Sequence, residues 1–337
     1  MPSLRRASGC LFGLAFGDAL GAQVEFLSVD RIRARFPPDG PQQPEGDPAR
    51  VTDDTQMALA VGEALMQTPR PYAPTQLERR LRQTFVAWLR DPENNRAPGR
   101  TCLQACGRLE QGLPWLQATV ASSKGCGANM RVAPVGLLPA GPKGIPEITR
   151  AAIAQFQAAI THGHPTALAA SDLTAKTIAE LIAGCSPQEL PAHLRAYAEE
   201  QRTIYHADWL GSLWQRSGLM SPEMFIARGW DECLAVLDRL DEALRQADRE
   251  QDPCLATGEG WIAEEAFATG LLCFLLYPDD PVAALRRAAV TAGDSDSIAC
   301  LTGAFAGAYH GFGAWPKEWI KCIEYAGRLA MLGSLWD

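Results

Sequence analysis

The 337-residue chain contains 47% hydrophobic and 21% charged residues, a composition typical of a globular protein with a large buried core. It excludes a disordered chain and a small fold that depends on disulfides. Thirty-one basic and thirty-nine acidic side chains give a net charge of −8, which argues against a surface that binds the backbone of long nucleic acids. A small anionic ligand in a local site remains compatible with this charge.

The N-terminal segment resembles part of a secretion signal, because Arg5 and Arg6 precede the apolar residues 10–16. Asp18 interrupts the apolar run too early for such a signal, and no segment reaches the ~18 to 20 apolar residues of a membrane-spanning helix. The ten cysteines form no C-x-x-C pair and lie in apolar stretches, as free thiols do in a reducing compartment. We therefore expect a cytoplasmic protein without a membrane segment and without a cysteine-bound zinc ion.

Glycine recurs every four residues along two expected helices, one near each end of the chain. Glycine costs about 1 kcal/mol relative to alanine inside a helix, so the repetition indicates a steric need that outweighs several kcal/mol. Close contact between two helices at the centre of a bundle would supply that need. The first helix also carries Asp18, whose carboxylate we expect to accept hydrogen bonds from a neighbouring helix end. The glycines are Gly9, Gly13, Gly17 and Gly21, and Gly303, Gly307 and Gly311.

Residues 36–50 contain a density of proline and glycine that no helix interior accepts. We expect a mobile surface loop here that closes over a ligand. Glu25 lies shortly before this loop, and we expect it to act as a metal ligand or as a proton-transfer group. Further loops at residues 91–99, 122–128 and 139–146 join helical stretches, and we expect their tips to converge on a site.

Thr52, Asp53, Asp54 and Thr55 directly precede a helical run. Threonine and aspartate commonly cap helix N-termini, which would explain one or two of these residues. Adjacent aspartates on one turn repel each other, however, unless a cation or solvent relieves the repulsion. Capping and metal binding therefore both remain open for this segment.

The other apolar residues recur mostly at helical spacing, and few runs alternate as strands do. The clearest examples are residues 77–89 and 234–244. The chain shows no linker of distinct composition and no repeat of fixed period. The sequence therefore predicts an all-α protein and one compact domain that spans residues 1–337.

A second acidic cluster, with Asp294, Asp296 and Ser297, directly precedes the C-terminal helix that carries the glycine stripe. Its donors are hard oxygen atoms, which suit Mg²⁺ or Mn²⁺ better than zinc or copper. Helix capping is again the alternative. If the fold brings the two acidic clusters together, their aspartates can hold two divalent ions about 4 Å apart.

Six segments in this order make the chain resemble the ADP-ribosylglycohydrolase family, of the dinitrogenase-reductase-activating glycohydrolase type. The resemblance covers almost the whole chain and implies an orthogonal helical bundle. Any one segment alone would be a weak indication. The segments are residues 9–21 with Glu25 and Phe26, 52–57, 125–131 with Ala133 and Pro134, 161–165, 260–266 and 293–297.

The resemblance implies a site for two Mg²⁺ ions, with Mn²⁺ as an alternative. It assigns the loop around Gly125 and Gly127 to the diphosphate and distal ribose of ADP-ribose, since glycine lets backbone N–H groups approach an anion. The metal ligands would be Thr52, Asp53, Asp54, Asp294, Asp296 and Ser297, with Glu25 reaching the first ion. The substrate-binding candidates are Glu25, Gly125, Cys126, Gly127, Met130 and His164, of which Met130 has core packing as its alternative.

The chain departs from the family pattern at two positions. The last motif usually reads Asp-Thr-Asp-Thr, and the serines here keep the hydroxyl oxygen, so we expect metal binding to be retained. Cys126 stands where the family usually has asparagine, which removes an amide from the substrate loop and leaves the substrate open. Several neighbouring residues receive minor interpretations: Lys124 as a phosphate contact, Arg131 as the partner of a structural ion pair, Trp261, Glu264 and Glu265 as structural, and His162 with no role.

The implied activity is magnesium-dependent hydrolysis of the glycosidic bond between ADP-ribose and a modified acceptor, with a protein side chain as the expected acceptor. The candidate catalytic carboxylates are Glu25, Asp54 and Asp296. Net charge disfavours a nucleic-acid acceptor without excluding it. One alternative is a protein of the same fold that binds ADP-ribose without cleaving it. A remote one is an all-α prenyl-diphosphate enzyme with an Asp-Asp-x-x-Asp motif, in which Met57 takes the place of the last aspartate.

Overall fold

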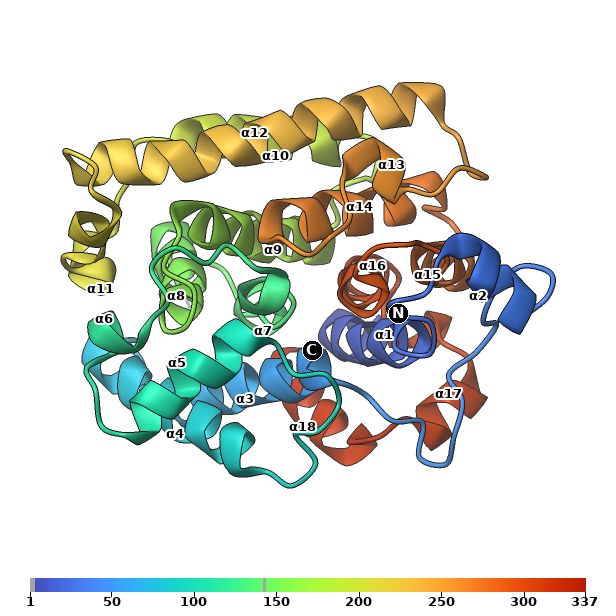
Figure 1. The fold of residues 1–337 in the computed structure, drawn as a ribbon, viewed down its shortest axis with the longest axis horizontal. Coiled ribbons are helices and arrows are strands. Elements are labelled where there is room, and N and C mark those ends of the chain that lie inside the picture. Colours follow the sequence, from blue (N-terminus) through green and yellow to red (C-terminus); the bar gives the residue numbers. More distant parts are fainter. Residues whose placement is uncertain (1–3, 142–143) are drawn as a thin grey trace.

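The computed structural model describes residues 4–141 and 144–337, and the regular elements in these residues are all helical (Figure 1). The predicted all-α class is confirmed. The α-helices are α1 (Arg6–Gly21), α2 (Val29–Arg35), α3 (Asp53–Gln67), α4 (Pro74–Arg90), α5 (Arg100–Glu110), α6 (Trp115–Ala118), α7 (Ala133–Gly136), α8 (Glu147–Ala159), α9 (Pro165–Ala183), α10 (Leu190–Gln201), α11 (Ala207–Leu210), α12 (Pro222–Gln246), α13 (Cys254–Thr257), α14 (Ala263–Leu276), α15 (Pro281–Ala289), α16 (Ser295–His310), α17 (Lys317–Cys322) and α18 (Ala326–Trp336).

Helices α1 and α16 lie side by side at the centre of the molecule and run in opposite directions (Figure 1). Their glycine stripes face each other so closely that backbone meets backbone. A Cβ atom built on Gly17 would lie 1.9 Å from the carbonyl oxygen of Ala299, and one on Gly303 would lie 1.9 Å from that of Gly13. The expected close contact between the two glycine-striped helices is confirmed. Helix α1 is buried on all sides from Ala7 to Gly21, as a central helix must be.

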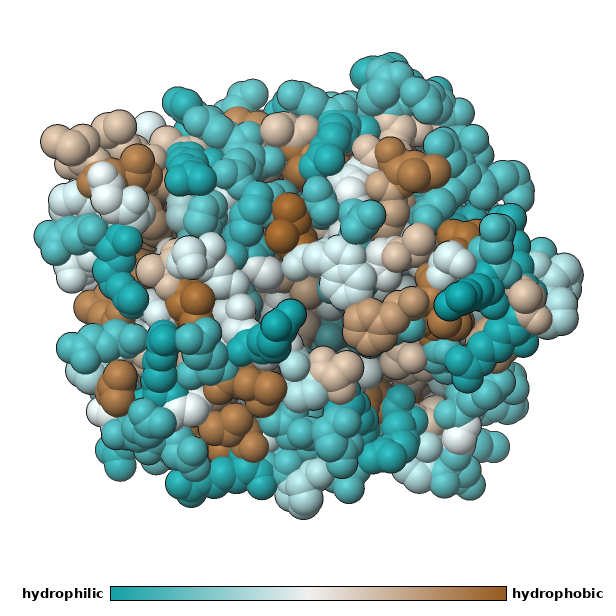
Figure 2. All heavy atoms as spheres, viewed as in Figure 1, coloured by the Kyte–Doolittle hydropathy of each residue, from teal (hydrophilic) through white to brown (hydrophobic). Residues whose placement is uncertain are grey.

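The other helices form layers around this pair. Helices α9 and α14 separate it from the long α12, and α3, α4 and α5 lie on the opposite side (Figure 1). The outer helices bury one face only: Trp230, Leu237 and Leu240 of α12 are buried, and so are Leu81 and Phe85 of α4. The face of the molecule seen in Figure 2 is mostly hydrophilic, with hydrophobic side chains in small scattered groups.

The described residues include no helix that is long and apolar enough to cross a membrane. The ten cysteines are free thiols, as expected. Seven of them are buried, and Cys126, Cys185 and Cys322 are partly exposed. The partly exposed thiols are therefore the ones that a ligand or a metal ion can reach from solvent.

Candidate active site

The start of α3 is held in place by the buried carboxylate of Asp18 on α1. Asp18 Oδ1 accepts hydrogen bonds from the N–H of Thr52 at 3.0 Å and from its hydroxyl at 2.9 Å. Asp18 Oδ2 accepts from the N–H of Thr55 at 3.0 Å and from its hydroxyl at 2.5 Å. The expectation for Asp18 is confirmed, because its partners are the polar groups of a neighbouring helix end. These bonds fix the position of Asp53 and Asp54 relative to α1.

The two acidic helix starts meet at one point. Thr52 Oγ1 lies 3.4 Å from Asp54 Oδ2 and 3.5 Å from Asp296 Oδ2, although positions 52 and 296 are 244 residues apart in the chain. One oxygen atom each of Glu25, Asp294 and Asp296 lies within 4.8 Å of the other two. The packing of α1 against α16, together with the bonds from Asp18 to α3, brings these groups together.

The carboxylates at this point are buried and repel one another. Each of the four aspartates at the two helix starts is at most 6% exposed. Burial raises the pKa of Asp53 to about 7, and burial together with the charges of Asp296 and Asp53 raises that of Glu25 to about 9. Burial and then Asp296 raise the pKa of Asp54 and Asp294 well above the ordinary range. In the metal-free protein, burial and mutual repulsion of the carboxylates therefore outweigh any compensation by neighbouring positive charge.

The donor atoms of the cluster fit a hard divalent cation. Asp54 Oδ1 is buried and has no hydrogen-bond partner among the described residues. A buried carboxylate oxygen without a partner is costly, and the cost increases beside other carboxylates. Oxygen donors without a nitrogen ligand are the set that Mg²⁺ and Mn²⁺ prefer. The residues present therefore suit the ions that the sequence predicts.

Mg²⁺ is expected to stabilise the protein more strongly at high pH than at low pH. The pKa of Asp53 is raised from 3.8 to about 7 and that of Glu25 from 4.5 to about 9. At pH values between the ordinary and the raised pKa of each group, the folded, metal-free protein therefore binds more protons than the unfolded chain. Its free energy of unfolding falls as the pH rises through this range. Thermal unfolding with chelator and with Mg²⁺, at about pH 5 and about pH 8, measures the effect. An equal rise of Tm at both pH values would contradict the charge-compensation argument.

A cavity of about 390 Å³ lies beside the carboxylates. Its rim carries Phe26 and Trp261, whose rings stack with centroids 5.8 Å apart and planes at 9°. These rings are 66% and 40% exposed, so large apolar surfaces face solvent at the entrance. Exposed aromatic rings beside a polar cavity commonly contact a flat or apolar part of a ligand.

Comparison with known proteins identifies the family of the chain. A model of the family described as ADP-ribosylglycohydrolase matches residues 1–336. The chain belongs to the ADP-ribosylglycohydrolase family. It is therefore a hydrolase of glycosidic bonds that acts on ADP-ribosylated substrates. The resemblance inferred from the six segments is confirmed.

The alignments with individual relatives cover nearly the whole chain. ADP-ribosylhydrolase ARH3 of Bos taurus is 26% identical, in an alignment covering 96% of this chain and 89% of that protein. The ADP-ribosyl-[dinitrogen reductase] glycohydrolase of Rhodospirillum rubrum is 25% identical, covering 95% and 90%. A solved structure titled "ADP-ribosylglycohydrolase-related protein complex" superposes with a TM-score of 0.65 at 25% identity, covering 98% of this chain and 96% of the other.

Most substrate-binding candidates of this family member line the acidic cavity. They are Glu25, Gly125, Cys126, Gly127 and Met130. The Cys126 thiol donates a hydrogen bond to Asp294 Oδ2 at 2.9 Å. Met130 is 2% exposed and packs in the core, and it also lines the cavity, so its contact with a substrate stays a prediction.

The two histidines of residues 161–165 line different cavities. His164 caps α9, where its Nδ1 accepts a hydrogen bond from the N–H of Thr166 at 3.3 Å, and it lines a second cavity of about 560 Å³. His162, which received no role, lines the acidic cavity, and its Nδ1 lies 2.8 Å from Thr161 Oγ1. Burial and then the charge of Arg131 lower the pKa of His162 well below its usual value, so this imidazole is neutral.

Two of the three predicted loops converge on the cavity. Residues 97–101 contribute to one wall and residues 125–127 to another. Residues 139–146 contribute no lining residue, as far as the chain is described on either side of positions 142 and 143. The proline-rich residues 36–50 do not line the cavity either, and Ala49 near the end of this segment is hydrogen-bonded to the backbone of Cys322 and Glu324. Their closure over a ligand stays a prediction.

Two basic residues have partners that the sequence did not indicate. The Arg131 guanidinium donates to Gln157 Oε1 at 2.9 Å and to Thr161 Oγ1 at 2.8 Å, so the expectation of an ion pair is wrong. Neutral acceptors are sufficient for the buried Arg131 side chain, because they accept the hydrogen bonds that its N–H groups donate. The Lys124 ammonium binds the carboxylates of Glu232 and Glu264 and does not line the acidic cavity. The ion pair of Glu264 with Lys124 agrees with the interpretation of Glu264 as a structural residue.

Proposed function

We propose that the protein is a Mg²⁺-dependent hydrolase that cleaves the glycosidic bond between ADP-ribose and a modified protein side chain. The observation that supports this most directly is the meeting of the acidic starts of α3 and α16 beside an open cavity. Membership in the family supplies the ADP-ribose part of the substrate. The name of the Rhodospirillum rubrum relative identifies a protein, dinitrogen reductase, as acceptor, and this supports a protein acceptor here.

Two Mg²⁺ ions, or Mn²⁺ ions, would be held by oxygen atoms from the two helix starts. When bound, they would neutralise the carboxylates and bind the hydroxyl groups of the distal ribose. The protein contributes the fixed positions of the donors, since Asp18 holds the start of α3 and the glycine contact holds α16. The metal ligands in this proposal are Thr52, Asp53, Asp54, Asp294, Asp296 and Ser297, with Glu25 reaching one ion.

The carboxylates of Glu25, Asp54 and Asp296 would carry the proton transfers of the reaction. Glu25 lines the cavity beside the stacked ring of Phe26, where the acceptor side chain would leave the site. The position of Glu25 at the cavity wall suits a group that exchanges a proton with the leaving atom. Asp54 or Asp296 would accept the proton of the attacking water.

The remainder of ADP-ribose would extend from the acidic cavity toward the second cavity. The two cavities share one stretch of chain, because residues 120–122 line the second cavity and residues 125–127 line the first. The second cavity is lined by His164 together with Arg108, Arg216 and Arg228, and these guanidinium groups would attract the diphosphate where it leaves the loop of Gly125 and Gly127. This path gives His164 a substrate contact at the end away from the metal site.

An assay of ADP-ribose release from peptides modified on arginine or on serine tests the proposal. We expect release in Mg²⁺ or Mn²⁺, loss of release in excess chelator, and recovery when the metal is restored. Undiminished hydrolysis in chelator would contradict the metal dependence. Calorimetry with ADP-ribose serves as the control: binding without release from any substrate would favour the alternative of a protein that binds ADP-ribose but does not cleave it.

Removal of the Cys126 thiol is expected to weaken Mg²⁺ binding through Asp294. The thiol donates to Asp294 Oδ2 at 2.9 Å, and loss of such a bond to a metal ligand costs about 10-fold in affinity. Cys126→Ala should therefore raise the Mg²⁺ concentration needed for half-maximal stabilisation. Cys126→Ser keeps a donor and serves as the matched control. Equal behaviour of both variants would show that the hydrogen bond does not orient Asp294.

A further inference from the structure

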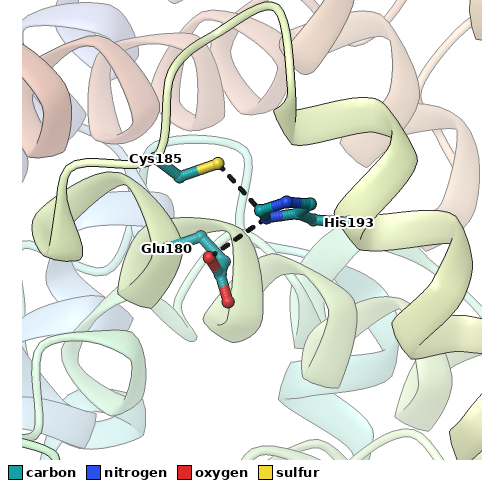
Figure 3. A group of neighbouring side chains, drawn as sticks. All are labelled: Glu180, Cys185 and His193. Carbon is teal, nitrogen blue, oxygen red and sulfur yellow. Dashed lines mark hydrogen bonds and ion pairs between the residues drawn. The ribbon is translucent and has the colours of Figure 1, made fainter.

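Three potential metal ligands converge where α9 ends and α10 begins. Glu180 lies in the last turns of α9, Cys185 in the connecting loop and His193 in the first turn of α10 (Figure 3). Gly184 ends α9 with a φ of 95°, and the N–H of Cys185 then donates to the carbonyl of Glu180 at 2.9 Å. This turn brings the thiol back over the helix end, facing α10.

The donor atoms are separated as ligands of one ion would be. His193 Nδ1 lies 3.5 Å from Cys185 Sγ and 3.6 Å from Glu180 Oε2, and all three ligand atoms lie within 4.8 Å of one another (Figure 3). Tetrahedral zinc, with Zn–S of about 2.3 Å and Zn–N of about 2.0–2.1 Å, separates sulfur and nitrogen ligands by about 3.5 Å. The side chains therefore need little movement to surround an ion.

The types of donor differ from those of the acidic cavity. Imidazole nitrogen and thiolate sulfur suit zinc and other transition metals, whereas Mg²⁺ prefers oxygen ligands. The Lys176 ammonium donates to Glu180 Oε1 at 2.9 Å and to Glu147 Oε2 at 2.8 Å. It occupies one oxygen of Glu180 and leaves Oε2 directed at His193, as an outer-shell partner orients a metal ligand.

The cluster is also open to solvent. The His193 side chain is 53% exposed and that of Glu180 is 24% exposed. An ion can therefore enter without opening the core, and a water molecule can complete the coordination. Such a site differs from the expectation of no cysteine-bound zinc ion, which rested on the absence of a C-x-x-C pattern. Here only one cysteine takes part, and the other two ligands come from α9 and α10.

We propose that Glu180, Cys185 and His193 form a zinc site, separate from the acidic cavity. On binding, the Cys185 thiol releases its proton to solvent and the thiolate becomes the sulfur ligand. The ion joins the end of α9 to the start of α10. Zinc is therefore expected to stabilise the folded protein without taking part in hydrolysis.

Titration with Co²⁺ in excess Mg²⁺ tests this proposal on the full chain. Co²⁺ replaces zinc in tetrahedral sites, and a bound thiolate gives it a charge-transfer absorption band in the near ultraviolet. We expect one equivalent of Co²⁺ to produce this band, Zn²⁺ to abolish it, and Cys185→Ser and His193→Ala to lack it. Cys322→Ser is the matched control, because Cys322 is the other partly exposed cysteine outside the acidic cavity, and its band should be unchanged.

Thermal unfolding provides a second readout. Zn²⁺ should raise the Tm of the wild type and of Cys322→Ser but not that of Cys185→Ser, while the three proteins unfold alike in chelator. Absence of a thiolate band in the wild type would overturn the proposal and leave the three side chains as a hydrogen-bonded group. A band that persists in Cys185→Ser and is lost in Cys126→Ser would also overturn it, by assigning the thiolate to the acidic cavity.

Discussion

Replacement of Asp296 by asparagine is expected to lower the rate of ADP-ribose release by about 10³-fold or more while the fold is retained. The substitution removes one negative charge from the metal site and from the proposed catalytic carboxylates. It keeps an acceptor for the N–H of Ser297, which now donates to Asp296 Oδ1 at 3.0 Å. Because the carboxylates repel one another without metal, the metal-free variant should unfold at a higher temperature than the wild type. Turnover assays and thermal unfolding in chelator measure the two effects.

Asp172→Asn is the matched control for this experiment. Asp172 is also buried, but its carboxylate accepts hydrogen bonds from Gln155 at 2.9 Å and Tyr197 at 2.8 Å, and it does not line the acidic cavity. Its substitution should lower stability and leave turnover of the folded protein unchanged. If Asp296→Asn retained wild-type turnover, or lost stability as Asp172→Asn does, the role of Asp296 as a metal ligand would be contradicted.

Gly17→Ala is expected to lower the free energy of unfolding by about 3 kcal/mol or more. The added Cβ would lie 1.9 Å from the carbonyl oxygen of Ala299 and 2.3 Å from its carbonyl carbon. These atoms are backbone, so no side chain can rotate away and the two central helices must separate. Denaturant unfolding measures the loss. The same separation would move Asp294 away from α3 and weaken Mg²⁺ binding.

Gly107→Ala provides the control for the effect of alanine itself. Gly107 lies in α5, and a Cβ atom there would meet nothing within 4 Å. Alanine has the higher helix propensity, so this variant should be more stable than the wild type by about 0.5–1 kcal/mol. Similar stabilities for Gly17→Ala and Gly107→Ala would show that the central helices can accommodate a side chain, and the steric explanation of the stripes would fail.

The parts of the site that follow from local patterns were predictable from the sequence. A Thr-Asp-Asp-Thr segment before a helical run predicts carboxylates at a helix start, and the four-residue glycine repeats predict the helix contact that the structure shows. The family resemblance connected these two observations. Asp18 was also predictable, because a buried carboxylate requires donors and a helix start is where unpaired N–H groups occur.

The parts that depend on packing between distant segments were not predictable. His162 and His164 stand two positions apart, and only the path of the loop before α9 decides which imidazole enters the acidic cavity. The stacking of Phe26 on Trp261 joins two segments far apart in the chain, and neither residue carries a local signal for it. Arg131 illustrates the same limit, since charge alone suggested a carboxylate partner and the fold supplied an amide and a hydroxyl.

The backbone contact between α1 and α16 has a consequence for the proposed metal site. Asp294 and Asp296 lie at the start of α16. Asp53 and Asp54 lie at the start of α3, which Asp18 ties to α1. The distance between the two pairs of carboxylates therefore depends on the separation of α1 and α16, and these helices already touch backbone to backbone. Calcium requires longer bonds to oxygen, of about 2.3–2.6 Å, and more ligands than magnesium, whose bonds are about 2.0–2.1 Å. A site of fixed width would discriminate between the proposed cations by ionic radius, and that discrimination would originate in the glycines of the two central helices.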